Sequence, residues 1–261
     1  MELTVRAILF DSDGTLIDST PAVRLTIARW CAQQGVDPRT FAAAQHGTRT
    51  VDLLRRFMMV PKKGSECTDE ELEEESEKLE KSVVETAKRM KEEGKGSGIV
   101  MLPGVEALLT KLREGGATWG IVTSGTRTHA FPALDAAEIG HQLPSVPFVV
   151  TGDLVNRGKP APDPYLAGFA ELRKLIPDLK ADEVLVIEDA PSGLQSGRAA
   201  GCRVLGVTTG PVSAEEVAEA ARQINGALVV KDLTSVELLS ASPGEIRLRV
   251  TPYALTAEKK E

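Results

Sequence analysis

Two aspartates, Asp11 and Asp13, directly follow an apolar run over residues 7–10 and precede Gly14. A short apolar run closed by a turn residue is typical of a buried parallel strand, and ligands of open α/β sheets bind beyond the carboxyl ends of such strands. Carboxylates two positions apart can point to the same side, where their repulsion favours a cation or a proton between them. The pair indicates a metal site or divided acid and base roles; an ordinary Asp- and Gly-rich turn is the alternative.

Hydroxyl groups follow a second apolar run. Residues 118–123 end at Thr123, and Ser124 and Gly125 come next. Hydroxyls and backbone N–H groups at the start of a helix can bind an anion. The alternative is an ordinary helix N-cap. The segment therefore predicts phosphate contacts at the same sheet edge as Asp11.

A lysine and a second acidic pair complete the set. Lys159 precedes Pro160, which keeps it out of a helix, and a loop lysine can reach a phosphate or a carboxylate. On its own it would be a solvent-exposed loop lysine. The apolar run 184–187 leads into Glu188 and Asp189, which repeats the pattern of the first strand. Four strands ending in such groups argue against four unrelated surface turns.

Together these groups predict a phosphate ester bound with Mg²⁺. The ion prefers a few carboxylates, waters and phosphate oxygens, while lysine and hydroxyl groups bind the remaining phosphoryl oxygens. Neither a Cys and His cluster suited to zinc nor a glycine-rich nucleotide-binding motif is present in the sequence. The absence of the motifs G-x-x-x-x-G-K-[ST] and G-x-G-x-x-G excludes the two kinds of nucleotide-dependent chemistry that rest on them.

Composition limits the class of protein and its partners. The 261 residues are 42% hydrophobic and 26% charged, as in globular proteins, and the formal net charge of −7 argues against nucleic acid as a partner. Three widely spaced cysteines do not form a disulfide framework and favour a reducing compartment. Neither a signal-like segment nor an apolar stretch long enough to span a membrane is apparent. We expect a cytoplasmic protein, and a monomer.

Strand and helix patterns alternate along most of the chain, which predicts an α/β fold with a parallel sheet covered on both faces. Helices are expected at 105–114, 164–175 and 192–200, and strands at 118–123, 147–151, 184–187 and 204–207. The tail at 233–261 carries only a weak strand signal at 246–250.

A helical segment interrupts this alternation near the N-terminus. Helices are expected at 21–35, 51–59 and 69–92, and the glycine-rich stretch 94–98 is typical of a flexible connector. The charges of 69–92 are mixed in sign and at helical spacing, which favours a solvated helix face over an interaction tail. We expect a core of residues 1–18 and 100–261 with a helical insertion at 19–99.

With these motifs in order over nearly its whole length, the chain resembles the haloacid dehalogenase superfamily of phosphohydrolases. The resemblance rests on residues 11–16 (DSDGTL), Thr123 with Ser124, Lys159, and Glu188 with Asp189. It implies a Rossmann-like parallel sheet and makes the helical insertion a small cap domain. Within the superfamily the chain is most similar to the fungal glycerol-phosphate and 2-deoxyglucose-6-phosphate phosphatases.

The resemblance also implies roles for the residues. Asp11 is the nucleophile that forms an aspartyl-phosphate, and Asp13 protonates the leaving alkoxide and then deprotonates water. Phosphate would be bound by Thr123, Ser124, Gly125 and Lys159, and Mg²⁺ by Asp11, the Asp13 backbone carbonyl, Glu188 and Asp189. Substrate contacts from the cap are expected at His46, Gly47 and Arg49, with an exposed Arg and a helix-capping His as the alternative.

Three functions agree with these residues. The first is a Mg²⁺-dependent phosphatase of a small polyol or sugar phosphate, such as glycerol-3-phosphate, 2-deoxyglucose-6-phosphate or another hexose-6-phosphate. A phosphosugar mutase would share the core residues and differ in its cap contacts and in the lifetime of the aspartyl-phosphate. A catalytically silent sugar-phosphate-binding regulator is the third, although a binder has no use for a nucleophile beside an acid.

Overall fold

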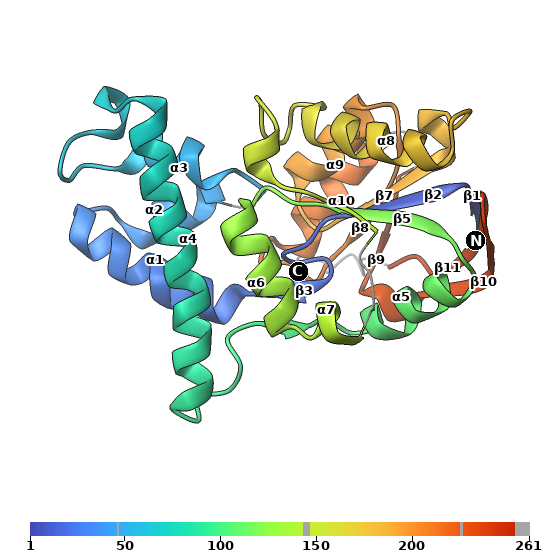
Figure 1. The fold of residues 1–261 in the computed structure, drawn as a ribbon, viewed down its shortest axis with the longest axis horizontal. Coiled ribbons are helices and arrows are strands. Elements are labelled where there is room, and N and C mark those ends of the chain that lie inside the picture. Colours follow the sequence, from blue (N-terminus) through green and yellow to red (C-terminus); the bar gives the residue numbers. More distant parts are fainter. Residues whose placement is uncertain (46, 143–146, 225–226, 254–261) are drawn as a thin grey trace, which may run out of the picture.

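A six-stranded parallel sheet forms the centre of the molecule (Figure 1). The structure, a computed structural model, describes all residues except 46, 143–146, 225–226 and 254–261. Across the sheet the strands run in the order β6 (Val149–Val150), β5 (Thr118–Val122), β2 (Ala7–Phe10), β7 (Val184–Glu188), β8 (Arg203–Val207) and β9 (Leu228–Val230). The predicted α/β class and parallel sheet are confirmed.

Both faces of the sheet are buried, because successive side chains of a strand point to opposite faces. Ala7 and Leu9 of β2 join one apolar cluster, whereas Ile8 and Phe10 join another. The first cluster includes side chains of α8 (Asp163–Leu175), α9 (Pro191–Ala199) and α10 (Ala214–Arg222). The second includes side chains of α5 (Val105–Glu114), α6 (Arg127–Ala136) and Ile139 of α7 (Ile139–Gln142).

A separate antiparallel sheet joins the two ends of the chain in the order β1 (Glu2–Val5), β11 (Glu245–Val250) and β10 (Val236–Ser242). Every second residue of β11 is buried, and Ile246 and Leu248 pack in the same cluster as Leu108 of α5. The sequence indicated only a weak strand at 246–250. This prediction was wrong, because two strands, β10 and β11, form in this part of the chain. Tertiary pairing with β1, far away in sequence, stabilises this part of the chain.

Two short strands carry the chain out of the core and back. β3 (Ile17–Asp18) pairs antiparallel with β4 (Val100–Met101), and the residues between them form the helical segment. It consists of α1 (Thr20–Gln34), α2 (Pro38–Gln45), α3 (Thr50–Phe57) and α4 (Asp69–Glu92). These helices share an apolar cluster of their own, which includes Ile27, Phe41 and Leu54. We propose that residues 19–99 are a cap domain.

The sequence predicted α1 and α4 well and missed α2. α1 has Pro21 in its first turn and ends at Gly35. α4 begins with a reciprocal capping box between Thr68 and Glu71, which satisfies the exposed N–H groups of its first turn. Short 3₁₀ helices complete the described fold at Gly64–Glu66, Gly152–Leu154, Ala181–Glu183 and Leu233–Ser235.

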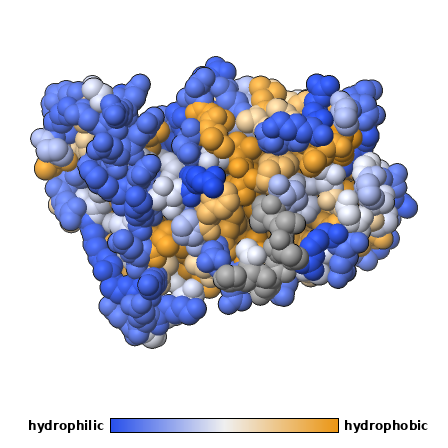
Figure 2. All heavy atoms as spheres, viewed as in Figure 1, coloured by the Kyte–Doolittle hydropathy of each residue, from blue (hydrophilic) through white to orange (hydrophobic). Residues whose placement is uncertain are grey.

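The charges of α4 form a solvated face, as predicted. Leu72, Leu79 and Val83 are buried, whereas most of its Glu and Lys side chains are exposed, and Figure 2 shows a largely hydrophilic surface over this helix. Cys31, Cys67 and Cys202 are buried and not joined in disulfides. Among the described residues, none of the helices combines the length and apolar character that a membrane span needs.

Candidate active site

The carboxyl ends of two neighbouring strands, β2 and β7, bring acidic groups together. Phe10 of β2 pairs with Ile121 of β5 and with Ile187 of β7, so Asp11, the residue after Phe10, lies beside Glu188, the residue after Ile187. One carboxylate oxygen from each of Asp11, Glu188 and Asp189 lies within 4.8 Å of the others. The strand register thus places three buried carboxylates at one point.

The loop after β2 is fitted to this cluster. Gly14 has φ 91°, and a Cβ atom there would lie 2.2 Å from Oδ2 of Asp189. Only glycine can adopt this backbone conformation and leave that space. Its position beside Asp13 therefore has a structural cause, the close approach of the two acidic loops.

Lys159 lies at the centre of the acidic cluster. Its side chain has no exposed surface, and its Nζ donates to Oδ1 of Asp11 at 2.6 Å, to Oε1 of Glu188 at 2.6 Å and to the Val122 carbonyl at 3.1 Å. The hydroxyl of Tyr165 donates to the same Glu188 oxygen at 2.9 Å. Glu188 is therefore occupied mainly in holding Lys159 in place.

The charges of the cluster remain unbalanced despite this lysine. Burial and the nearby Glu188 raise the pKa of Asp11 to about 7, although Lys159 lowers it. Burial, Asp11 and Glu188 likewise raise the pKa of Asp189 well above its ordinary value. Oδ2 of Asp11 is buried and has no hydrogen-bond partner. An orphaned carboxylate oxygen beside a second destabilised carboxylate fits a divalent cation.

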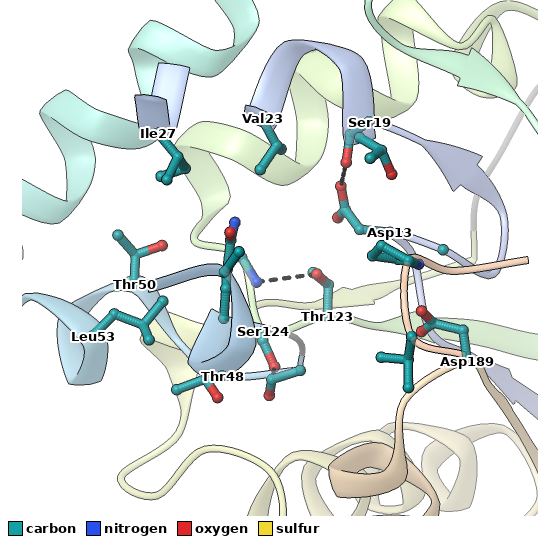
Figure 3. A pocket seen from close by; sticks show the side chains of 18 of the residues that line it. Asp13, Ser19, Val23, Ile27, Thr48, Thr50, Leu53, Thr123, Ser124 and Asp189 are labelled. Atoms are coloured by element: carbon teal, nitrogen blue, oxygen red, sulfur yellow. Dashed lines mark hydrogen bonds between the residues drawn. The ribbon is translucent and has the colours of Figure 1, made fainter. Parts of the chain in front are cut away.

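The predicted hydroxyl groups lie at the neighbouring strand end (Figure 3). Thr123 is buried, and its Oγ1 accepts a hydrogen bond from the Gly125 N–H at 3.1 Å. The Ser124 hydroxyl donates to the carbonyl of Gly47 in the helical segment at 2.9 Å. These three core residues line the same cavity as Asp11.

The hydrogen-bond partners of Asp13 do not belong to the acidic cluster. Its Oδ1 accepts hydrogen bonds from the Ser19 hydroxyl at 2.5 Å and from Nε2 of His129 at 3.1 Å. Burial alone would raise the pKa of Asp13, but His129 and Ser19 lower it. Burial alone would lower the pKa of His129, but Asp13 raises it to about 9. The two partners therefore form an ion pair at neutral pH.

A cavity of about 690 Å³ lies between the core and the helical segment. Asp11, Asp13 and Asp189 line it from the core. Val23 and Ile27 of α1 and Leu53 of α3 face it from the other side (Figure 3). Its walls are thus charged and hydroxyl-bearing at the sheet edge and partly apolar beneath the helices.

A family comparison agrees with this geometry. Residues 8–207, more than half of the chain, match the model of the haloacid dehalogenase-like hydrolases. The chain belongs to this family. The resemblance of the strand-end motifs is therefore confirmed, and the matched segment contains every candidate site residue.

Several curated relatives of this haloacid dehalogenase-like hydrolase are phosphatases. It is 38% identical to hexitol phosphatase A of Escherichia coli over 203 residues, which cover 77% of this chain and 82% of the relative. Glycerol-1-phosphate phosphohydrolase 1 of Saccharomyces cerevisiae is 34% identical, with 80% and 77% covered. 2-Deoxyglucose-6-phosphate phosphatase 1 of the same yeast is 31% identical, with 80% and 82% covered.

The residues predicted for the cap have a different outcome from those of the core. His46 lies outside the described residues. Gly47 lines the cavity with φ 71°, and a Cβ atom there would lie 2.1 Å from the Ser192 hydroxyl. Thr48 and Thr50, on either side of Arg49, also line the cavity, but Arg49 does not.

Arg49 is paired elsewhere. Its guanidinium donates to Asp52 at 2.8 and 3.0 Å and to the Val155 carbonyl of the core at 2.9 Å. The structure therefore does not place Arg49 in contact with a ligand of the cavity. We propose that it joins the helical segment to the core of this haloacid dehalogenase-like hydrolase.

Lys159 also differs in detail from its expected position. It is not among the residues that line the cavity, because it lies beneath Asp11 with its three hydrogen bonds satisfied by protein groups. Direct phosphate contact by Lys159 stays a prediction.

Sequence reasoning missed three polar residues of the site. His129 and Tyr165 lie within helices, where a single polar residue gives no pattern that marks function. Glu80 belongs to the charge-rich α4, yet it is buried and accepts hydrogen bonds from the Thr126 N–H, at 3.0 Å, and from the Thr126 hydroxyl. Because Glu80 is one of many acidic residues in α4, only the fold distinguishes it.

Proposed function

We propose that this protein is a Mg²⁺-dependent phosphatase that hydrolyses a small polyol or sugar phosphate through an aspartyl-phosphate. The observation that carries the proposal is the buried and unpartnered Oδ2 of Asp11, a residue that contacts Lys159 and lines a cavity edged with hydroxyl groups. Oδ1 accepts a hydrogen bond from Lys159, so Oδ2 is the oxygen of Asp11 that no protein group occupies. The phosphatase relatives support the same reaction class.

The chain's own groups divide the reaction into two steps. Asp11 attacks phosphorus and expels the alcohol, and Asp13 gives the departing alkoxide a proton. Because a phosphate dianion raises the pKa of a neighbouring carboxyl, substrate entry favours the protonated form of Asp13 that this step needs. In the second step Asp13 takes a proton from the water that hydrolyses the aspartyl-phosphate.

A Mg²⁺ ion would be held by the side chains of Asp11 and Asp189 and by the Asp13 backbone carbonyl. When bound, the ion supplies positive charge that offsets the repulsion between a carboxylate and a phosphate dianion. Glu188 is a positioning group for Lys159, since its Oε1 is taken by Lys159 and Tyr165 and its Oε2 by the Ala190 N–H. Thr123, Ser124 and Gly125, which line the cavity, would bind the phosphoryl group.

The volume and the lining of the cavity suit a small hydroxylated leaving group. Its volume of about 690 Å³ is enough for a sugar or polyol phosphate, and its wall opposite Asp11 combines Thr50 with apolar side chains. The names of the relatives, for a hexitol, glycerol-1-phosphate and 2-deoxyglucose-6-phosphate, agree with this class. A monomeric state and a cytoplasmic location stay predictions.

A phosphate-release screen tests this function. We expect purified protein with Mg²⁺ to release inorganic phosphate from polyol or hexose phosphates in a panel that includes glycerol phosphates, hexitol phosphates and 2-deoxyglucose-6-phosphate. Removal of the metal by a chelator should abolish the release, and added Mg²⁺ should restore it. Isomerised sugar phosphate without net phosphate release would instead identify a mutase, and tight binding without any turnover would identify a regulator.

A variant of Asp13 tests the proton-transfer step. We expect Asp13→Asn to lower kcat for glycerol-3-phosphate by about 1000-fold, because an alkoxide leaving group needs a proton. The loss with 4-nitrophenyl phosphate should be at least about tenfold smaller, since nitrophenolate leaves without one. The two kcat values are measured side by side in the same preparation. Equal losses would contradict the acid role.

A further inference from the structure

His129 is a buried histidine whose function no motif of the sequence indicates. It lies in the first turn of α6, is 6% exposed, and lines the cavity. Its Nε2 is 3.1 Å from Oδ1 of Asp13, whereas its Nδ1 is buried and has no hydrogen-bond partner. The side chain therefore directs its polar contact to Asp13.

The surrounding chain leaves room for this ring. A Cβ atom at Gly125 would lie 3.0 Å from Cδ2 of His129, which is closer than ordinary packing allows. With a side chain at position 125, the imidazole or the loop would have to shift by a few tenths of an ångström. Gly125 therefore has a second role beside its predicted phosphate contact.

Ser19 supports the same carboxylate oxygen from a different element. It precedes α1 at the N-cap position, but its side chain caps no helix N–H and donates to Oδ1 of Asp13 at 2.5 Å instead. Figure 3 shows Ser19 and Asp13 joined by this hydrogen bond at the edge of the cavity. Two donors from separate parts of the chain, Ser19 and His129, thus hold a single oxygen atom.

This arrangement fixes the orientation of the second oxygen of Asp13. None of the described residues donates a hydrogen bond to Oδ2 of Asp13, and the side chain keeps 31% of its surface exposed. A carboxyl group that gives and then accepts a proton needs one oxygen turned toward the reacting atoms. With Oδ1 held, Oδ2 is that oxygen.

We propose that His129 is a positioning residue that holds the Asp13 carboxyl group, together with Ser19, so that Oδ2 exchanges the proton with the leaving alcohol. The inference rests on the proposed phosphatase function. It assigns His129 no contact with the phosphoryl group and no contact with the metal. A histidine that served only to fill space in the fold would leave the reaction insensitive to the choice of leaving group.

The test compares two variants with two substrates. We expect His129→Leu, which removes the donor, to lower kcat for glycerol-3-phosphate by about 30-fold and for 4-nitrophenyl phosphate by less than about fivefold, with little change in KM. His129→Gln, whose amide can donate from a similar position, should recover most of the loss. The melting temperature of each variant is measured to show that it is folded.

A double variant distinguishes an effect of His129 through Asp13 from a general loss of activity. In the Asp13→Asn background, His129→Leu should lower kcat by less than about twofold further, since groups that act through one another are not additive. Equal losses with both substrates, or a full additional loss in the Asp13→Asn background, would overturn the inference. If the leucine variant does not fold, His129→Phe, which keeps an aromatic ring and removes the donor, takes its place: a ratio of kcat for glycerol-3-phosphate to kcat for 4-nitrophenyl phosphate within about twofold of wild type overturns the proposal.

The outcomes also separate this inference from the proposed function. Wild-type protein that hydrolyses neither substrate in the presence of Mg²⁺ would contradict the phosphatase function itself. Wild-type protein that hydrolyses both, with variants of His129 that show no preference between leaving groups, would contradict only the positioning role.

Discussion

Asp11→Asn is expected to abolish phosphate release, with kcat at least about 1000-fold below that of the wild-type protein. Asparagine has nearly the shape of aspartate, but its amide is a far weaker nucleophile than a carboxylate. Lys159 keeps Glu188 as an ion-pair partner in the variant, and the loss of one buried negative charge relieves repulsion within the acidic cluster. The variant should therefore fold and still bind phosphate esters.

The measurement is inorganic phosphate released from the best substrate of the panel, with the melting temperature recorded for each protein. Asp178→Asn is a matched control, because Asp178 is 79% exposed and pairs with Arg6 at the surface. We expect wild-type activity from this control. Phosphate release by Asp11→Asn at more than a few per cent of the wild-type rate would mean that the nucleophile is another group.

The strand ends could be predicted from the sequence because their chemistry is local. β2 and β7 are buried on both faces, so their apolar runs are continuous, and the polar residues that end them stand out. Parallel pairing then brings the carboxyl ends of the strands to one edge, whatever the details of packing. Asp11, Glu188 and Asp189 therefore meet as the sequence indicated.

Other elements depend on contacts between distant parts of the chain. β11 alternates between exposed and buried residues and pairs with β1, more than 230 positions away. The contact between His129 and Asp13 spans 116 positions, so neither residue reveals the other in the sequence. Such pairings become visible only when the fold brings the segments together.

Arg49 differs from His129, because the sequence spacing does indicate the partner of Arg49. Asp52 follows it by three positions at the start of α3, a spacing at which oppositely charged side chains can pair. The resemblance to known phosphatases drew attention to substrate contact instead. The structure joins Arg49 to Asp52 and to the Val155 carbonyl, so the local spacing was the better guide.

The contacts between the cap and the core connect the helical segment to the chemistry. Ser19 binds Asp13, Gly47 accepts a hydrogen bond from Ser124, and Glu80 binds Thr126. Each contact joins a residue of the helical segment to a residue of the proposed site or to the residue next to one. The geometry of the site therefore depends on the position of the helical segment.

Lys159→Met is expected to destabilise the protein and to lower kcat at least about 1000-fold. Methionine has a similar length and no charge, so Asp11 and Glu188 would face each other without a cation. Removal of one partner from a buried ion pair costs about 3 to 5 kcal/mol when the remaining charge persists. Attack by Asp11 would also lose the positive charge that offsets repulsion from the phosphate.

The destabilisation should depend on pH in a defined direction. Burial and Glu188 already raise the pKa of Asp11 from 3.8 to about 7, and Lys159 opposes that rise. Without Lys159 the folded-state pKa is higher still, so the folded protein binds protons that the unfolded chain has released. In both folded proteins Asp11 keeps its proton well below pH 7, so the stability of the variant relative to wild type should fall as pH rises through about 7, where Asp11 of the wild-type protein loses its proton. The deficit should therefore be larger at pH 8 than at pH 5.

The free energies of unfolding of both proteins, measured in denaturant from pH 5 to pH 8 with a chelator present, check this expectation. Lys174→Met is the matched control, because Lys174 is 68% exposed and its pair with Glu171 contributes little to stability. A deficit that stays constant with pH would mean that lost packing, rather than uncompensated charge, destabilises the variant. Added Mg²⁺ should reduce the deficit at pH 8, since a cation bound by Asp11 and Asp189 replaces part of the missing positive charge.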